Sequence, residues 1–274
     1  MHVVKTISLW AHAAREAGMS EERLHAANVW TIRSVFSTLT NVNFSEDRIA
    51  EYIKEGMAIK KDLEKLVPAA SAPTGPVAEV DLSGKTLEEL EEFGYSVSIP
   101  VRQAAMGNED CFSLNEIATY GSKGAAAYAA HCYQLGKMDD SVMKDMHEVY
   151  CKLSSDEADM EGLLANALKV GDINGRILAM LDDAHATTFG DPEPTPVKMT
   201  ATEGKAILIS GHDLVDLEVL LKQTEGTGVN VYTHGEMLPA HGYPGLKKYP
   251  HLVGNYGTFV ASQLMLYSCC LIDM

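Results

Sequence analysis

The chain lacks the features that define several classes of protein. Its five cysteines are an odd number and contain no Cys-x-x-Cys pair, which argues against a disulfide framework and against the usual ferredoxin-like and zinc-ribbon sites. Basic residues are few: 22 Lys and Arg stand against 38 Asp and Glu, and the formal net charge is −16. Such a charge opposes electrostatic binding to nucleic acid or to anionic lipid, so we expect neither partner.

The sequence also lacks a segment that predicts secretion or a membrane span. No N-terminal stretch combines a charged start, an apolar middle and a small-residue cleavage site. The longest uncharged, apolar-rich run, residues 260–272, is shorter than the roughly 20 residues that a spanning helix needs. We therefore expect a soluble, cytoplasmic protein. Its hydrophobic content of 46% is enough for the core of one or two domains.

Apolar residues at helical spacing dominate the first two-thirds of the chain. Ser45 is placed to cap a helix that Pro68 ends, and residues 68–84 have the proline and small-residue composition of a connecting loop. Thr86 with Glu89 has the spacing of a capping box, which marks the start of another helix.

A second capping-box pattern, Ser113 with Glu116, predicts a long helix over Leu114–Leu135. Further helices are expected over 141–153, 156–170 and 173–186, before three prolines between residues 192 and 196 interrupt the pattern. We therefore predict a mainly α protein. A helical-bundle domain over 1–200, divided into two sub-bundles near 68–84, is followed by a partial α/β domain over 201–274 with a Rossmann-like parallel sheet.

Two short apolar strands after residue 200 are each followed by metal-ligand residue types. Residues 206–210 precede His212, and residues 229–232 precede Glu236. The leucines between them recur at helical spacing, so the segment is one β-α-β unit, and a single crossover helix makes its two strands parallel. Ligands of open parallel sheets bind beyond the carboxyl ends of the strands. We predict that His212 and Glu236 face one crevice there.

The same region carries a family resemblance. The motifs are Gly211-His-Asp-Leu214, the run from Gln223 to Pro244 that contains Thr233-His-Gly-Glu236, and His251-Leu-Val-Gly-Asn-Tyr-Gly257. Together they resemble the hybrid cluster protein family, also called hydroxylamine reductases. Weaker similarity extends upstream, so the resemblance covers nearly the whole chain up to about Gly257. We expect the residues after Gly257 to depart from the family pattern.

The resemblance implies a cofactor and an activity. In the family, one histidine, two glutamates and several cysteines hold a hybrid iron-sulfur-oxygen cluster, and the matching positions here are His212 and Glu236. The implied reaction is the reduction of hydroxylamine, or of nitric oxide, with electrons from an external donor. Family members also begin with a cysteine-rich segment for a second iron-sulfur cluster. The first cysteine here is Cys111, so we expect that second site to be absent.

The remaining cysteine ligands of the hybrid cluster are also expected to be missing. We therefore expect this chain to be a fragment that holds no stable four-iron cluster by itself and lacks activity. Two alternatives stay open: a mononuclear zinc or iron hydrolase site at His212, Glu236, His234 and His241, and a non-catalytic helical interaction module. The apolar run 260–272 is expected to join the sheet, to pack on it, or to promote self-association.

Overall fold

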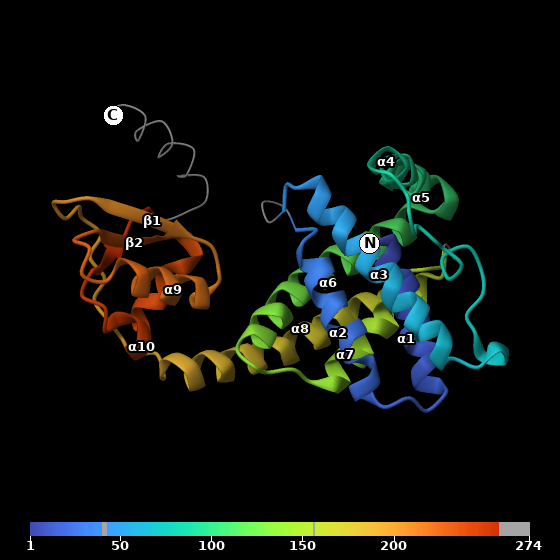
Figure 1. Ribbon diagram of the computed structural model, residues 1–274, viewed down its shortest axis with the longest axis horizontal. Helices are drawn as coiled ribbons and strands as arrows, with labels where there is room; N and C mark the ends of the chain where they lie inside the picture. The colour runs from blue at the N-terminus through green and yellow to red at the C-terminus, as the bar shows by residue number, and fades with distance from the viewer. Residues whose placement is uncertain (40–42, 156, 258–274) are drawn as a thin grey trace. The chain divides into compact units, whose positions relative to one another are not determined.

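The structure, a computed structural model, describes residues 1–39, 43–155 and 157–257. The chain divides into two compact units, one over Met1–Leu181 and one that begins at Asp182 (Figure 1). The predicted class is confirmed, because the first unit is helical and the second contains a small parallel sheet. The exact domain division that we predicted, with a boundary near residue 200, stays a prediction.

The first unit consists of helices joined by short loops and one longer connection. The connection between the third and fourth helices contains a short 3-10 turn, η1, at Ala69–Ser71. The helices are α1 (His2–Glu16), α2 (Glu21–Phe36), α3 (Glu46–Leu66), α4 (Leu87–Ser96), α5 (Ile99–Met106), α6 (Glu109–Gln134), α7 (Asp140–Lys152) and α8 (Met160–Phe189), the last of which continues into the second unit.

Two of the predicted helix starts are confirmed in atomic detail. The Ser45 hydroxyl accepts a hydrogen bond from the backbone N–H of Arg48 at 3.3 Å. Thr86 and Glu89 form a reciprocal capping box, in which each side chain accepts from the backbone N–H of the other. Both caps satisfy amide groups that a helix start leaves without intrahelical partners, so the sequence pattern located these boundaries correctly.

Two other boundary predictions are wrong. Helix α6 begins at Glu109, because the Asn108 side chain accepts from the N–H of Cys111 at 3.0 Å, and Ser113 lies inside the helix. The helices expected over 156–170 and 173–186 form one helix, α8, whose buried positions Val170, Ile173 and Ile177 continue along a single face. Continuous burial of that face offsets the cost of the intervening glycine, which on its own weakens a helix.

The core of the first unit is formed where α1 packs against α3 and α7, and α2 packs against α6 (Figure 1). Helices before and after residues 68–84 contribute to one buried cluster, so the two sub-bundles that we predicted share a core. Helices α2 and α3 lie close together at Gly56. A Cβ added at Gly56 would lie 2.5 Å from Cζ2 of Trp30, so only glycine fits there without movement.

A polar network is buried inside this apolar core. His147 on α7 contacts Ser8 Oγ through Nδ1 at 2.9 Å and Asn28 Oδ1 through Nε2 at 3.1 Å. Arg15 donates to the same Asn28 oxygen at 3.0 Å and to Glu21 at 2.7 Å. Complete burial lowers the pKa of His147 from 6.5 to about 3, so the imidazole is neutral at physiological pH. The network joins α1, α2 and α7 and fixes their relative register.

The second unit contains the predicted β-α-β unit and one further strand. Strands β1 (Ala206–Ser210), β2 (Asn230–His234) and β3 (Leu252–Asn255) form a parallel sheet in the order β1-β2-β3, and helix α9 (Leu214–Thr224) connects the first two (Figure 1). The 3-10 segment η2 (Gly235–Gly242) and the short helix α10 (Pro244–Lys247) lie between β2 and β3 in the chain. Strand β3 was not predicted from the sequence.

No helix within the described ranges has the length and apolar character needed to cross a membrane.

Candidate metal-ligand site

The two predicted ligand residues follow the ends of neighbouring strands. Ser210, the last residue of β1, is paired in register with His234, the last residue of β2. His212 and Glu236 each lie two residues further on, and both are exposed. The structure therefore confirms that they follow the carboxyl ends of adjacent parallel strands. That their side chains open into one crevice stays a prediction.

The loops after the strands have local conformations that keep these residues outside the sheet. Gly211 has a φ of +125° and Gly235 a φ of +55°, values that side chains disfavour, so each strand turns away directly after its last residue. Asp213 caps α9 and accepts from the N–H groups of Val215 at 2.8 Å and Asp216 at 3.2 Å. Asp213 is thereby engaged in the helix start, so we do not assign it as the acceptor that orients His212.

His234 lies between the two ligand positions but is completely buried. Its Nδ1 is 3.5 Å from the Ser210 hydroxyl, and its Nε2 has no hydrogen-bond partner among the described residues. A Cβ added at Gly257 would lie 2.7 Å from this Nε2, so the glycine backbone packs directly against the ring. The turn after β3 thus closes over the end of β2.

The other two histidines of this region are held in structural contacts. His241 Nε2 is 2.9 Å from the hydroxyl of Thr233, and burial lowers the pKa of His241. His251 Nε2 is 3.0 Å from both the Leu221 carbonyl and the Thr224 hydroxyl, at the amino end of β3. In the described part of the chain, no three His, Cys, Asp or Glu side chains gather in a way that could hold a metal ion. The mononuclear hydrolase alternative therefore gains no support.

The described cysteines belong to the helical unit and are poor candidates for ligands. Burial raises the pKa of Cys132 to about 11 and that of Cys151 to about 12. Cys111, which precedes the helix that we predicted over Leu114–Leu135, lies in the first turn of α6 and is buried. Since metals bind the thiolate form, burial works against ligation by Cys132 and Cys151. Cys269 and Cys270 lie outside the described residues.

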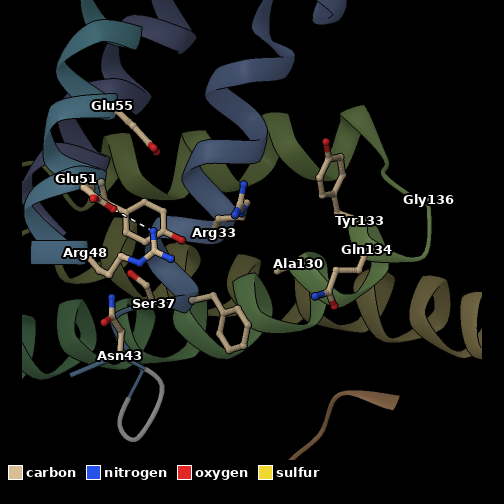
Figure 2. A pocket seen from close by; sticks show the side chains of 12 residues that line it. Arg33, Ser37, Asn43, Arg48, Glu51, Glu55, Ala130, Tyr133, Gln134 and Gly136 are labelled. Atoms are coloured by element: carbon tan, nitrogen blue, oxygen red, sulfur yellow. Dashed lines mark hydrogen bonds and ion pairs between the residues drawn. The ribbon is translucent and has the colours of Figure 1, made fainter. Parts of the chain in front are cut away.

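A large surface hollow in the helical unit was not anticipated from the sequence. It has a volume of about 910 Å³ and lies among α2, α3 and the end of α6, as Figure 2 shows. Arg33 and Arg48 line it together with Glu51 and Glu55, and Arg48 pairs with Glu51 at 3.1 Å. The lining carries two arginines and two glutamates and so has no net charge, and we assign the hollow no role.

The comparisons with known proteins place the chain in a family. A sequence model of the Prismane/CO dehydrogenase family matches residues 1–271. The hydroxylamine reductase of Yersinia pseudotuberculosis serotype O:3 is 40% identical over 284 residues, which cover 99% of this chain and 51% of that protein. The hydroxylamine reductase of Salmonella gallinarum is 43% identical over 280 residues, which cover 97% and 50%. The chain belongs to the Prismane/CO dehydrogenase family.

Two consequences follow from the extent of these matches. The chain spans about half the length of the curated relatives that it matches. The family match runs to residue 271, so our expectation that the pattern stops at about Gly257 is wrong. The apolar run 260–272, which we expected to join the sheet, to pack on it or to promote self-association, lies outside the described residues.

His212 and Glu236 fit the family cluster in part. Their donor types are an imidazole and a carboxylate, and both side chains are exposed at the edge of the sheet where ligands of α/β proteins bind. Two such ligands do not complete a four-iron site, and the described cysteines do not add to them. The role of His212 and Glu236 as cluster ligands stays a prediction.

Proposed function

We propose that this chain contributes to an oxidoreductase of the hybrid cluster protein type, which reduces hydroxylamine or nitric oxide with electrons from an external donor. The observation that carries the proposal is the position of His212 and Glu236 beyond the paired ends of β1 and β2. Membership of the family and the resemblance to hydroxylamine reductases support it.

His212 and Glu236 would bind iron of the cluster through nitrogen and oxygen. Such harder ligands leave iron more open and more oxophilic than thiolates do, which suits binding of a small nitrogen-oxygen compound. When bound, the cluster would pass two electrons to hydroxylamine, which takes up two protons and yields ammonia and water. This chain's part is to hold two ligands at fixed positions on a rigid sheet edge.

Reconstitution of the isolated chain tests whether His212 and Glu236 alone are enough to hold a cluster. After anaerobic reconstitution with iron and sulfide, we expect no stable four-iron cluster by metal and acid-labile sulfide analysis. With a chemical electron donor, hydroxylamine reduction should be no faster than that of the His212→Ala variant. A clear turnover that depends on His212 would contradict this expectation, and stoichiometric zinc would instead favour the hydrolase alternative.

A chimera tests the proposed function itself. The 274 residues of this chain replace the matching half of the Yersinia hydroxylamine reductase, which supplies the rest of the protein. We expect the chimera to contain iron with acid-labile sulfide and to reduce hydroxylamine. The variants His212→Ala and Glu236→Gln should each lower both the iron content and the activity.

Two matched variants serve as controls for the chimera. Glu225→Gln removes an exposed carboxylate at the opposite, amino end of β2, and His25→Ala removes an exposed imidazole in the helical unit. Both should leave iron content and activity unchanged. A folded chimera that retains its cluster and its activity after His212→Ala and Glu236→Gln would contradict the proposal.

A further inference from the structure

The segment that carries Glu236 is closed at its base by a contact between two side chains. Glu236 lies in the first turn of η2, and η2 contacts all three strands of the sheet. Near the other end of η2, Nε2 of the buried His241 lies 2.9 Å from the hydroxyl of Thr233, which belongs to β2. The contact joins residues on either side of Glu236, so it limits the conformations that the segment between them can adopt.

Thr233 is the centre of a larger network. Its hydroxyl donates to Oδ1 of Asn255, the last residue of β3, at 2.9 Å. The side-chain amide of Asn255 donates in turn to the carbonyl of Gly257 at 2.9 Å. The backbone carbonyl of Thr233 accepts from the N–H of Tyr256 at 2.8 Å. One threonine thereby connects the end of β2 to η2 and to the turn that follows β3.

Burial makes these contacts strong constraints on η2. Thr233, His241 and Asn255 are all buried, and a buried polar group that loses its partner carries the cost of its desolvation. The segment η2 has weak constraints of its own, because 3-10 hydrogen bonds have poor geometry and Pro239 inside it lacks an N–H. The position of η2 therefore depends on the contacts at its ends.

The loops after β1 and β2 also touch each other. Met237, the residue after Glu236, is buried, and a Cβ added at Gly211 would lie 3.9 Å from its Cε. Gly211 directly precedes His212. A displacement of η2 would therefore move Glu236 relative to His212 and would also disturb the packing beside His212.

We propose that Thr233 is a positioning residue for Glu236. Its hydroxyl holds η2 against the end of β3 and thereby fixes Glu236 relative to His212. Groups that orient a ligand without binding the metal are often nearly as sensitive to substitution as the ligand itself. The role of Thr233 toward a cluster rests on the proposed function, whereas its hold on η2 does not.

The chain contains a matched contact at the opposite end of the sheet. The hydroxyl of Thr224, the last residue of α9, lies 3.0 Å from Nε2 of His251, at the amino end of β3. Thr224 and Thr233 are both buried, and each contacts a histidine. Only Thr233 contacts the segment that carries Glu236, so Thr224 is a control for the loss of a buried threonine hydroxyl.

Hydrogen exchange in this chain tests whether Thr233 holds η2. Thr233→Val keeps the shape of the side chain and removes its hydroxyl, whereas Thr233→Ser keeps the hydroxyl. We expect Thr233→Val to speed exchange of the η2 amides by roughly 10- to 100-fold relative to the α9 amides, because partners of the hydroxyl are left unpaired. Thr233→Ser should have a much smaller effect, and Thr224→Val should leave η2 unchanged.

A double-substitution cycle in the chimera described above tests whether Thr233 acts through Glu236. Thr233→Val alone should lower the iron content and should lower hydroxylamine reduction by roughly 10- to 100-fold, as expected for a residue that supports a metal ligand. In the Glu236→Gln chimera the same change should cause little further loss, because the group that it positions is already altered. Thr233→Ser should retain most of the iron and activity, and Thr224→Val should retain both.

Three results would overturn the proposal. Equal acceleration of η2 and α9 by Thr233→Val would assign the residue to the stability of the whole α/β unit, and unchanged η2 exchange would show that other contacts hold η2. Losses from Thr233→Val and Glu236→Gln that multiply would show that Thr233 does not act through Glu236. A wild-type chimera without iron would instead contradict the proposed function, and hydrogen exchange would still decide whether Thr233 holds η2.

Discussion

The helical unit buries the polar network around His147, whereas the α/β unit exposes the two predicted ligand residues, His212 and Glu236. In the helical unit, His147 is completely buried and bonded on both ring nitrogens, and two cysteines are kept from ionising by burial. In the α/β unit, His212 and Glu236 are exposed just beyond the strand ends. The polar network around His147 holds helices together, whereas His212 and Glu236 are accessible to solvent.

This difference explains why residue type alone is a poor guide to function in this chain. Histidines occur in both units, but His241 and His251 are as firmly engaged in hydrogen bonds as His147. Exposure at a strand end, rather than the presence of an imidazole, separates His212 from the others. Four sets of substitutions test this difference between the two units.

The largest effect is expected from a cavity in the helical core. Leu24 is completely buried, so Leu24→Ala should lower the free energy of unfolding of the helical unit by about 2–5 kcal/mol. Both tryptophans, Trp10 and Trp30, lie in this unit, so fluorescence during urea unfolding reports on it alone. The exposed Leu208→Ala should leave this transition unchanged. Equal effects of the two substitutions would contradict the contrast between the buried Leu24 and the exposed Leu208.

An added methyl group at the α2–α3 contact should have the next largest effect. Gly56→Ala forces a Cβ against Trp30 and Val3, and overpacking of this kind costs about 1–3 kcal/mol. Gly124→Ala is the matched control on α6, where an added Cβ meets nothing within 4 Å. That change should stabilise the helix by about 0.5–1 kcal/mol, since alanine has the higher helix propensity. If the urea midpoints of both variants shift in the same direction, the steric explanation for Gly56 is wrong.

The buried network should make the helical unit sensitive to acid. The pKa of His147 is lowered from 6.5 to about 3 in the folded protein, so the unfolded chain binds this proton more readily. The stability that the neutral, buried His147 contributes is fully present above pH 6.5 and is lost as the pH falls toward 3. The free energy of unfolding changes by at most about 1.4 kcal/mol per pH unit over this range. Urea unfolding between pH 7 and pH 4.5 measures this slope. His147→Gln should show a shallower dependence than wild type, and identical slopes would exclude His147 as the cause.

The smallest effect is expected at the proposed ligand positions. His212→Ala and Glu236→Gln remove exposed side chains, so each should change the stability of the α/β unit by less than about 0.5 kcal/mol. His234→Ala removes a completely buried ring from the same region and should cost more, at least about 1 kcal/mol. Hydrogen exchange of the β2 amides measures the change in stability for each of these variants. A large loss of stability from His212→Ala would assign that residue a structural role.

Local sequence patterns were sufficient to predict the β-α-β unit and the placement of His212 and Glu236 after its strands. Short apolar strands, leucines at helical spacing and glycines at the turns are local signals, and a single crossover helix permits only parallel strands. The caps at Ser45 and Thr86 were predictable for the same reason, because a cap depends on residues within one helical turn. Family motifs in these loops then led to the prediction that His212 and Glu236 are cluster ligands, and this role stays a prediction.

Features that depend on contacts between distant residues could not be predicted from the sequence. Asn108 rather than Ser113 starts α6, α8 runs on through an expected break, and β3 forms where no strand pattern was recognised. The burial of His147 and the contact of Gly257 with His234 join residues far apart in the chain. No local pattern encodes such contacts, because the energy that fixes them comes from packing between elements rather than from the propensities of neighbouring residues.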